Sequence, residues 1–148
     1  MRILLRLTAV AAFLLLCPLS RSQAEEPKHR LVIQVDQDDP AVMNLALNNA
    51  TNVIDYYRAK GETVDLDIVT YGPGLTMLRA DTSPVKERLA ATHEALPQMV
   101  FSACHNTLEA MRRAEGKDIP LLPPARIVPA GIARLIELQE QGWSYVKV

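Results

Sequence analysis

Short apolar runs alternate with longer stretches of helical periodicity along most of the chain. Five runs have the length and composition of strands: 30–35, 63–71, 98–103, 125–128 and 143–148. Between them, apolar residues at three- and four-residue steps predict four helices: 41–60, 84–96 capped by Ser83, 107–115 capped by Asn106, and 129–141. No internal repeat and no linker interrupts this alternation.

Strands that alternate with helices predict a mostly parallel sheet, because a crossover between parallel strands is long enough to hold a helix. We therefore predict the α/β fold class, with residues 25–148 as one domain. Its architecture would be a three-layer α/β/α sandwich around a five-stranded, mostly parallel sheet. The first four runs are apolar and rich in β-branched residues, which predicts burial on both faces of the sheet.

A ligand site is expected where the strands of such a sheet end. In parallel α/β sheets, ligands bind beyond the carboxyl ends of the strands. Four loops fall at that edge: 36–40, 71–74, 104–106 and 129–131. We predict Cys104 as the catalytic residue, with these binding residues around it: Asp36, Gly72, Gly74, His105, Asn106, Thr107, Pro129 and Gly131.

Cys104 is expected one residue past the third strand and two before the cap of the next helix. Unpaired N–H groups and the positive end of the helix dipole stabilise an anion there, so the thiol should ionise readily. His105 would add to this effect when protonated. The alternative is a buried, inert side chain, since free cysteine is among the most buried residue types.

Several thiol chemistries lack their partner residues in this sequence. No second cysteine lies three residues from Cys104, which argues against dithiol exchange. No arginine follows at the sixth position, as a phosphatase-type cradle would need. His29 and His93 are placed away from this edge, so neither suits the base of a cysteine protease. What remains is a single-cysteine acceptor that passes its cargo to another molecule.

Other motifs near the strand ends have structural explanations. The run "DQDDP" at 36–40 offers carboxylates to a hard cation, but Asp38 or Asp39 capping the first helix is the favoured interpretation. The run "YGPGL" at 71–75 could hold an anion through its backbone, or be a simple turn. We therefore predict no metal and no cofactor.

Residues 1–24 have the pattern of a secretory signal. Two arginines precede a short apolar run, a proline follows, and the small residues Ser22 and Ala24 suit cleavage after Ala24. Lipid attachment at Cys17 is disfavoured because Leu16 is too large for the usual pattern. We therefore expect a periplasmic or secreted protein in which Cys104 is the single remaining cysteine. An unpaired thiol in an oxidising compartment calls for an explanation.

The charge balance excludes some partners. The chain carries 16 basic and 17 acidic residues, and cleavage after Ala24 would remove three arginines and no acid. A phosphate backbone is bound by a basic surface, so we expect no nucleic-acid partner. We also expect no membrane association once the signal is removed.

Four segments carry a resemblance to a known family: "RLVIQVDQDDP", "VDLDIVTYGPGLTML", "VFSACHNTLEAM" and "IVPAGIARLIELQEQGWSYVKV". Over 30–148, the chain resembles the DsrE/DsrF-like family of small sulfur-relay proteins, in particular an exported branch of unassigned function. The resemblance implies a flavodoxin-like sandwich that assembles into homo-oligomers, trimers or hexamers.

In the sulfur-relay members, one cysteine after a central strand receives sulfur as a persulfide and passes it on; by motif it is Cys104. The partner would be a sulfur donor or acceptor protein, or a small sulfur compound. The well-understood members work in the cytoplasm as hetero-oligomers, whereas this chain carries the pattern of an export signal. A non-catalytic small-anion binding module and an oligomeric accessory protein remain the alternatives.

Overall fold

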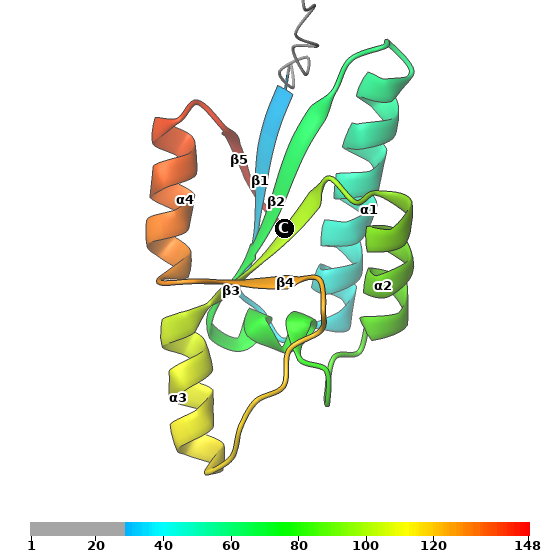
Figure 1. Ribbon diagram of the computed structural model, residues 1–148. Helices are drawn as coiled ribbons and strands as arrows, with labels where there is room; N and C mark the ends of the chain where they lie inside the picture. The colour runs from blue at the N-terminus through cyan, green and yellow to red at the C-terminus, as the bar shows by residue number, and fades with distance from the viewer. Residues whose placement is uncertain (1–28) are drawn as a thin grey trace, which may run out of the picture.

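Five parallel strands form one sheet in the computed structural model, which describes residues 29–148 (Figure 1). They are β1 His29–Val35, β2 Val64–Thr70, β3 Met99–Cys104, β4 Ala125–Val128 and β5 Ser144–Lys147. Their order across the sheet is β4-β3-β2-β1-β5, and every neighbouring pair is parallel. The predicted signal over 1–24, with Cys17, lies outside the described residues.

Helices cover both faces of this sheet. They are α1 Pro40–Arg58, α2 Lys86–Ala95, α3 His105–Glu115 and α4 Gly131–Glu140, with a 3-10 helix η1 at Gly72–Leu78. Figure 1 shows α1 and α2 on one side of the sheet and α4 on the other. The predicted three-layer α/β/α sandwich is therefore confirmed, and it is consistent with the flavodoxin-like class.

The core has two unequal parts because successive strand residues point to opposite faces. Toward α1 and α2, a large cluster contains the fully buried Ile33, Ile68 and Phe101. Toward α4, the buried cluster is small and consists of Val32, Val69, Leu135 and Leu138. Tyr71 and Trp143 are partly buried and pack against this cluster. The hydrophobic attachment of α4 is thus much smaller than that of α1.

Three helix starts differ from the predictions. Helix α3 begins at His105 rather than Thr107, and α4 begins at Gly131, two residues after Pro129. Ser83 does not cap α2, which begins at Lys86 after Val85. The Ser83 hydroxyl instead accepts from the Val85 N–H at 3.3 Å and donates to a carbonyl of η1, the helix that replaces the simple turn expected after β2.

The expected burial of the first four strands on both faces is wrong for β4. Its residues are half-buried or exposed, because β4 is an edge strand that pairs with β3 alone. The strand ends at the carboxyl edge beside Cys104, since Val128 pairs with Cys104 in the register. Among residues 29–148, no helix has the length and apolar character needed to cross a bilayer.

Candidate functional site

The strand order places two helix N-termini at one point on the carboxyl edge. After β3 the chain moves outward to β4, and after β4 it returns through α4 across the sheet to β5. The direction of the chain therefore reverses at β3 and β4, which is where ligands bind in open α/β sheets. Cys104, the last residue of β3, lies at this reversal.

Cys104 itself is the N-cap of α3. Its backbone is extended, with φ −67° and ψ 117°, and the helix begins at the next residue. The cap had been expected at Asn106, two residues later. An N-cap side chain lies where it can accept from the second and third N–H groups of the helix. Here those groups belong to Asn106 and Thr107, and the Cys104 side chain lies beside them without a capping hydrogen bond.

Polar groups from two helices surround the Cys104 sulfur and lower the pKa of its thiol. They are the hydroxyl and N–H of Thr107, the N–H of Gly131 from α4, and the N–H of Asn106. The Thr107 hydroxyl oxygen also accepts from the Gly72 N–H at 2.9 Å, which leaves its own proton for the sulfur. Two helix N-termini and the loop after β2 thus converge on one atom.

These donors decide the direction of the Cys104 pKa. Burial of the sulfur raises the pKa of the thiol, but the Thr107, Gly131 and Asn106 donors outweigh it, so the pKa lies below its ordinary value. Cys104 is only 5% exposed, as the inert alternative requires. A buried thiol among aliphatic groups would have a raised pKa instead. The surroundings of Cys104 are therefore those of an anion.

The other predicted residues divide into those that reach this centre and those that do not. Asn106, Thr107 and Gly131 lower the pKa of the Cys104 thiol, and the Gly72 N–H donates to the Thr107 hydroxyl. His105 is exposed, and it is not among the groups that lower the pKa of Cys104 most strongly.

Pro129, Gly74 and Asp36 contribute in other ways. Pro129 lines a small hollow of about 120 Å³ beside Val128 and α4. Gly74 packs against β1 so closely that a Cβ would lie 2.3 Å from the Val35 carbonyl oxygen. Asp36 accepts from Lys147 at 2.8 Å, and this contact lowers the pKa of its carboxyl.

Tyr71 and Lys147 were not predicted as site residues. Tyr71 follows β2 directly and packs on the start of α4. A Cβ atom added to Gly131 would lie 2.9 Å from the Cβ atom of Tyr71. Burial and the nearby Asp36 raise the pKa of Tyr71. The position of Tyr71 just before the Gly-Pro-Gly turn was the signal that could have identified it. Lys147 lies in β5 and gave no comparable signal.

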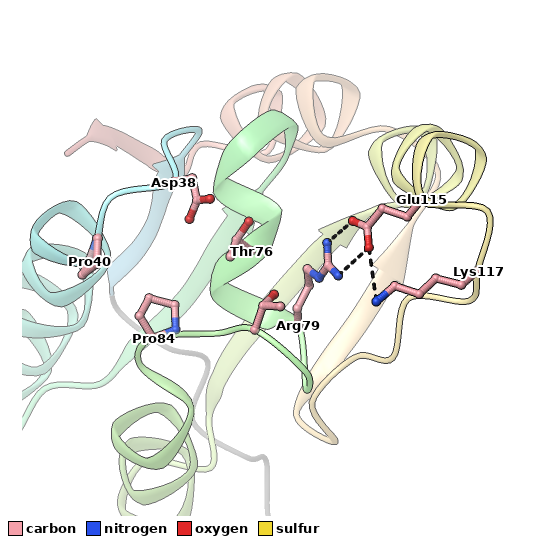
Figure 2. A pocket seen from close by; sticks show the side chains of 8 residues that line it. Asp38, Pro40, Thr76, Arg79, Pro84, Glu115 and Lys117 are labelled. Carbon is pink, nitrogen blue, oxygen red and sulfur yellow. Dashed lines mark hydrogen bonds and ion pairs between the residues drawn. The ribbon is translucent and has the colours of Figure 1, made fainter.

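A hollow larger than the one beside Pro129 lies elsewhere. A hollow of about 450 Å³ is lined by Asp38, Thr76, Arg79, Glu115 and Lys117, with proline walls (Figure 2). None of the predicted site residues lines it.

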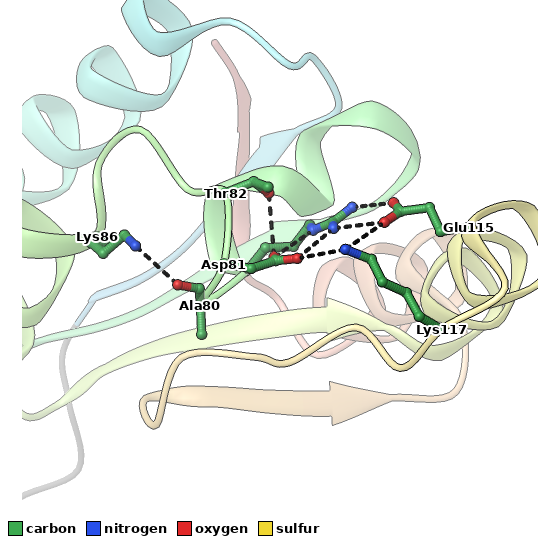
Figure 3. A network of polar contacts seen from close by, with 7 residues as sticks. Ala80, Asp81, Thr82, Lys86, Glu115 and Lys117 are labelled. Atoms are coloured by element: carbon green, nitrogen blue, oxygen red, sulfur yellow. Dashed lines mark hydrogen bonds and ion pairs between the residues drawn. The ribbon is translucent and has the colours of Figure 1, made fainter.

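The charges around that cavity are paired with one another. The Arg79 guanidinium donates to both oxygens of Asp81, at 2.9 and 2.8 Å, and to Glu115 at 3.0 Å. Lys117 lies 3.5 Å from each of these carboxylates (Figure 3). The Arg79 pKa is raised by Asp81 and then Glu115. These contacts tie η1 to the end of α3, which is a structural role.

The acidic run after β1 acts as a helix cap. The Asp39 carboxylate accepts from the Ala41 N–H at 2.7 Å, which confirms the capping interpretation. Within residues 29–148, no group of three or more His, Cys, Asp or Glu side chains is arranged to hold a metal ion.

Comparison with known proteins finds similarity among solved structures. No family model matches the chain, and no curated protein matches it. Among solved structures, it is similar to the protein of unknown function MTH1491 from Methanobacterium thermoautotrophicum, with 30% sequence identity and a TM-score of 0.67. The match covers 81% of this chain and 99% of the archaeal protein.

Proposed function

The chain belongs to the same family as MTH1491, whose function is unknown, and we propose from its own site that it is a single-cysteine sulfur carrier with a sulfurtransferase-like reaction. In this proposal Cys104 receives one sulfur atom as a persulfide and passes it to an acceptor. The resemblance to the DsrE/DsrF-like sulfur-relay family, stated above, implies the same role.

The chemistry needs a thiolate and a way to hold the sulfur that it receives. The Cys104 thiolate attacks the outer sulfur of a polysulfide or thiosulfate, the S–S bond of the donor breaks, and a shorter polysulfide or sulfite leaves with the electron pair. The new persulfide carries the negative charge on its terminal sulfur. A second thiolate then attacks that sulfur, and the Cys104 thiolate is released. No net oxidation occurs, and both steps balance in charge.

One observation carries this proposal: the Cys104 sulfur lies at the start of α3, where the Thr107 hydroxyl and the N–H groups of two helix N-termini lower the pKa of its thiol. Helix N-termini favour anions through their free N–H groups and dipole. Charge-assisted hydrogen bonds of this kind are about twice as strong as neutral ones. They favour the ionised sulfur of the free protein, and a persulfide anion extends the same charge by one atom.

Mass spectrometry of the intact protein tests the proposal. Purified protein is incubated with polysulfide or with thiosulfate, desalted and weighed. We expect a gain equal to one sulfur atom, reversed by a low-molecular-weight thiol and absent from Cys104→Ser. Failure to observe the adduct with several donors would refute the carrier function while leaving the fold unaffected.

The burial of Cys104 favours a second candidate, a non-catalytic module that binds a small anion at the same edge with the cysteine as part of its wall. It predicts that Cys104→Ser keeps anion binding, because serine at the same cap position can accept from the same N–H groups. Sulfite and sulfate titrations by calorimetry, on both proteins, distinguish the two functions.

Export and self-association are part of the proposal. Residues 1–24 have the pattern of a signal, and fractionation of expressing cells tests a periplasmic or secreted location. Ile132 and Ile136 lie one turn apart on α4, each 51% exposed, and exposed apolar surface of this kind is typical of interfaces. Light scattering distinguishes a homotrimer from a hexamer.

A further inference from the structure

An ion pair between a buried carboxylate and an arginine side chain that is 30% exposed joins α4 to the middle of the sheet. Asp67 of β2 is 0% exposed, and one of its oxygens, Oδ2, accepts from Nε and Nη2 of Arg134, both at 3.0 Å. Its other oxygen, Oδ1, is buried and has no hydrogen-bond partner among the described residues. Burial raises the pKa of Asp67, and the Ser102 hydroxyl and Arg134 oppose it.

Such a pair needs an explanation beyond stability. Removing two charges from water costs about as much as their attraction returns, so a buried pair is often replaceable by apolar side chains without loss. The best attested use of a buried ionic contact is to fix the position of one element on another. The unpartnered Oδ1 makes this pair costly even by that standard.

The first turn of α4 has few other contacts. Its buried side chains, Leu135 and Leu138, lie in later turns, whereas Ile132 and Ala133 are exposed. Arg134 belongs to the first turn, because its N–H donates to the carbonyl of the N-cap residue Ala130 at 3.0 Å. The hydrophobic contacts of α4 therefore leave the start of the helix free to shift unless another contact holds it.

Strand β2 and the residue that follows it supply two contacts to α4. Asp67 of β2 binds Arg134, and Tyr71, directly after the strand, packs against Gly131. Val69 of β2 belongs to the same small cluster as Leu135. The N–H of Gly131 is one of the groups that lower the pKa of Cys104.

We propose that Asp67 and Arg134 are positioning residues, which seat the first turn of α4 against Cys104 and so keep the Gly131 N–H on the sulfur. Neither residue touches the reacting atom. The inference deepens the proposed function and rests on its site, because it concerns how α4 is held beside the Cys104 sulfur. A site built from two helix N-termini requires that both helices keep their positions relative to the sulfur. The Asp67–Arg134 pair keeps α4 in place.

The pH dependence of Cys104 alkylation by iodoacetamide tests the inference, with circular dichroism as the check on folding. We expect Arg134→Gln to move the midpoint of the profile upward and to lower the rate by about tenfold at a pH below the original midpoint, as loss of one charge-assisted hydrogen bond would. Asp67→Asn keeps the shape of the side chain and should act in the same direction. Arg134→Lys keeps the charge and should restore part of the rate.

Leu138→Ala is the matched control. It removes a buried side chain from the far part of the same helix, so it should lower the stability of the fold without moving the midpoint. The inference is overturned if folded Arg134→Gln and Asp67→Asn keep the original midpoint, or if Leu138→Ala moves it equally. A moved midpoint together with no sulfur adduct on the unmodified protein would support the positioning role and reject the carrier function.

Discussion

Replacing Thr107 by valine should raise the pKa of Cys104 with almost no change in side-chain shape. The threonine hydroxyl accepts from the Gly72 N–H at 2.9 Å and lowers the pKa of the neighbouring thiol. Valine keeps the branched outline but removes this hydroxyl. The thiolate then loses one of the groups that oppose the effect of burial.

The magnitude follows from the charge of the acceptor. A hydrogen bond to a charged group contributes about 1.5–3 kcal/mol, and about 1.4 kcal/mol corresponds to a tenfold change in ionisation. Cys104 is 5% exposed, so water replaces the lost hydroxyl poorly. We therefore expect roughly ten- to a hundredfold less thiolate at a pH below the midpoint. The Gly72 N–H also loses its acceptor, which should cost about 1–3 kcal/mol of folding stability.

The assay is the rate of alkylation by iodoacetamide as a function of pH, followed by intact mass. Burial of the sulfur lowers the plateau of this profile, but the midpoint reports the pKa. Thr107→Ser is the control, because it retains a hydroxyl and should retain most of the thiolate. If Thr107→Val is folded and has the midpoint of the unmodified protein, the hydroxyl does not stabilise the thiolate and the proposed site is wrong.

Three further outcomes follow from other parts of the structure. Gly74→Ala should destabilise the fold by about 1–3 kcal/mol in urea unfolding, because its Cβ would lie 2.3 Å from a backbone oxygen that cannot move aside. Arg79→Met should lower the midpoint of the same measurement, since it leaves Asp81 and Glu115 without the guanidinium, whose side chain is 7% exposed. Arg79 holds the pKa values of these two carboxyls below their ordinary values. Their stabilising contribution is therefore present above about pH 4 and is lost as the pH falls through the lowered values. The free energy of unfolding should accordingly depend less steeply on pH across that range in Arg79→Met than in the unmodified protein.

The elements of the fold were predictable because they depend on local periodicity. Apolar runs of strand length and three- and four-residue steps identified all five strands and four helices within a few residues. The exposure of β4 was not predictable in this way, because an apolar run looks the same in an edge strand with one neighbour and in a central strand with two. Strand order decides that, and it is a property of the whole sheet.

The site was predictable only in part. The strand-end position of Cys104 identified the neighbourhood, and Asn106, Thr107 and Gly131 followed from it. Its place as the N-cap was missed, because cysteine is not among the usual cap residues and Asn106 is. The partnership of Asp67 with Arg134 gave no signal, since 67 residues separate them and only the packing of α4 brings them together.

The central claim is that the Cys104 sulfur is held as an anion by the donors around it. Ultraviolet absorbance of the thiolate, titrated with pH and corrected with Cys104→Ser, measures this without any reagent reaching the buried atom. We predict half-ionisation below the ordinary cysteine value of about 8.5. A midpoint at or above that value would contradict the claim, because burial would then outweigh the Thr107, Gly131 and Asn106 donors.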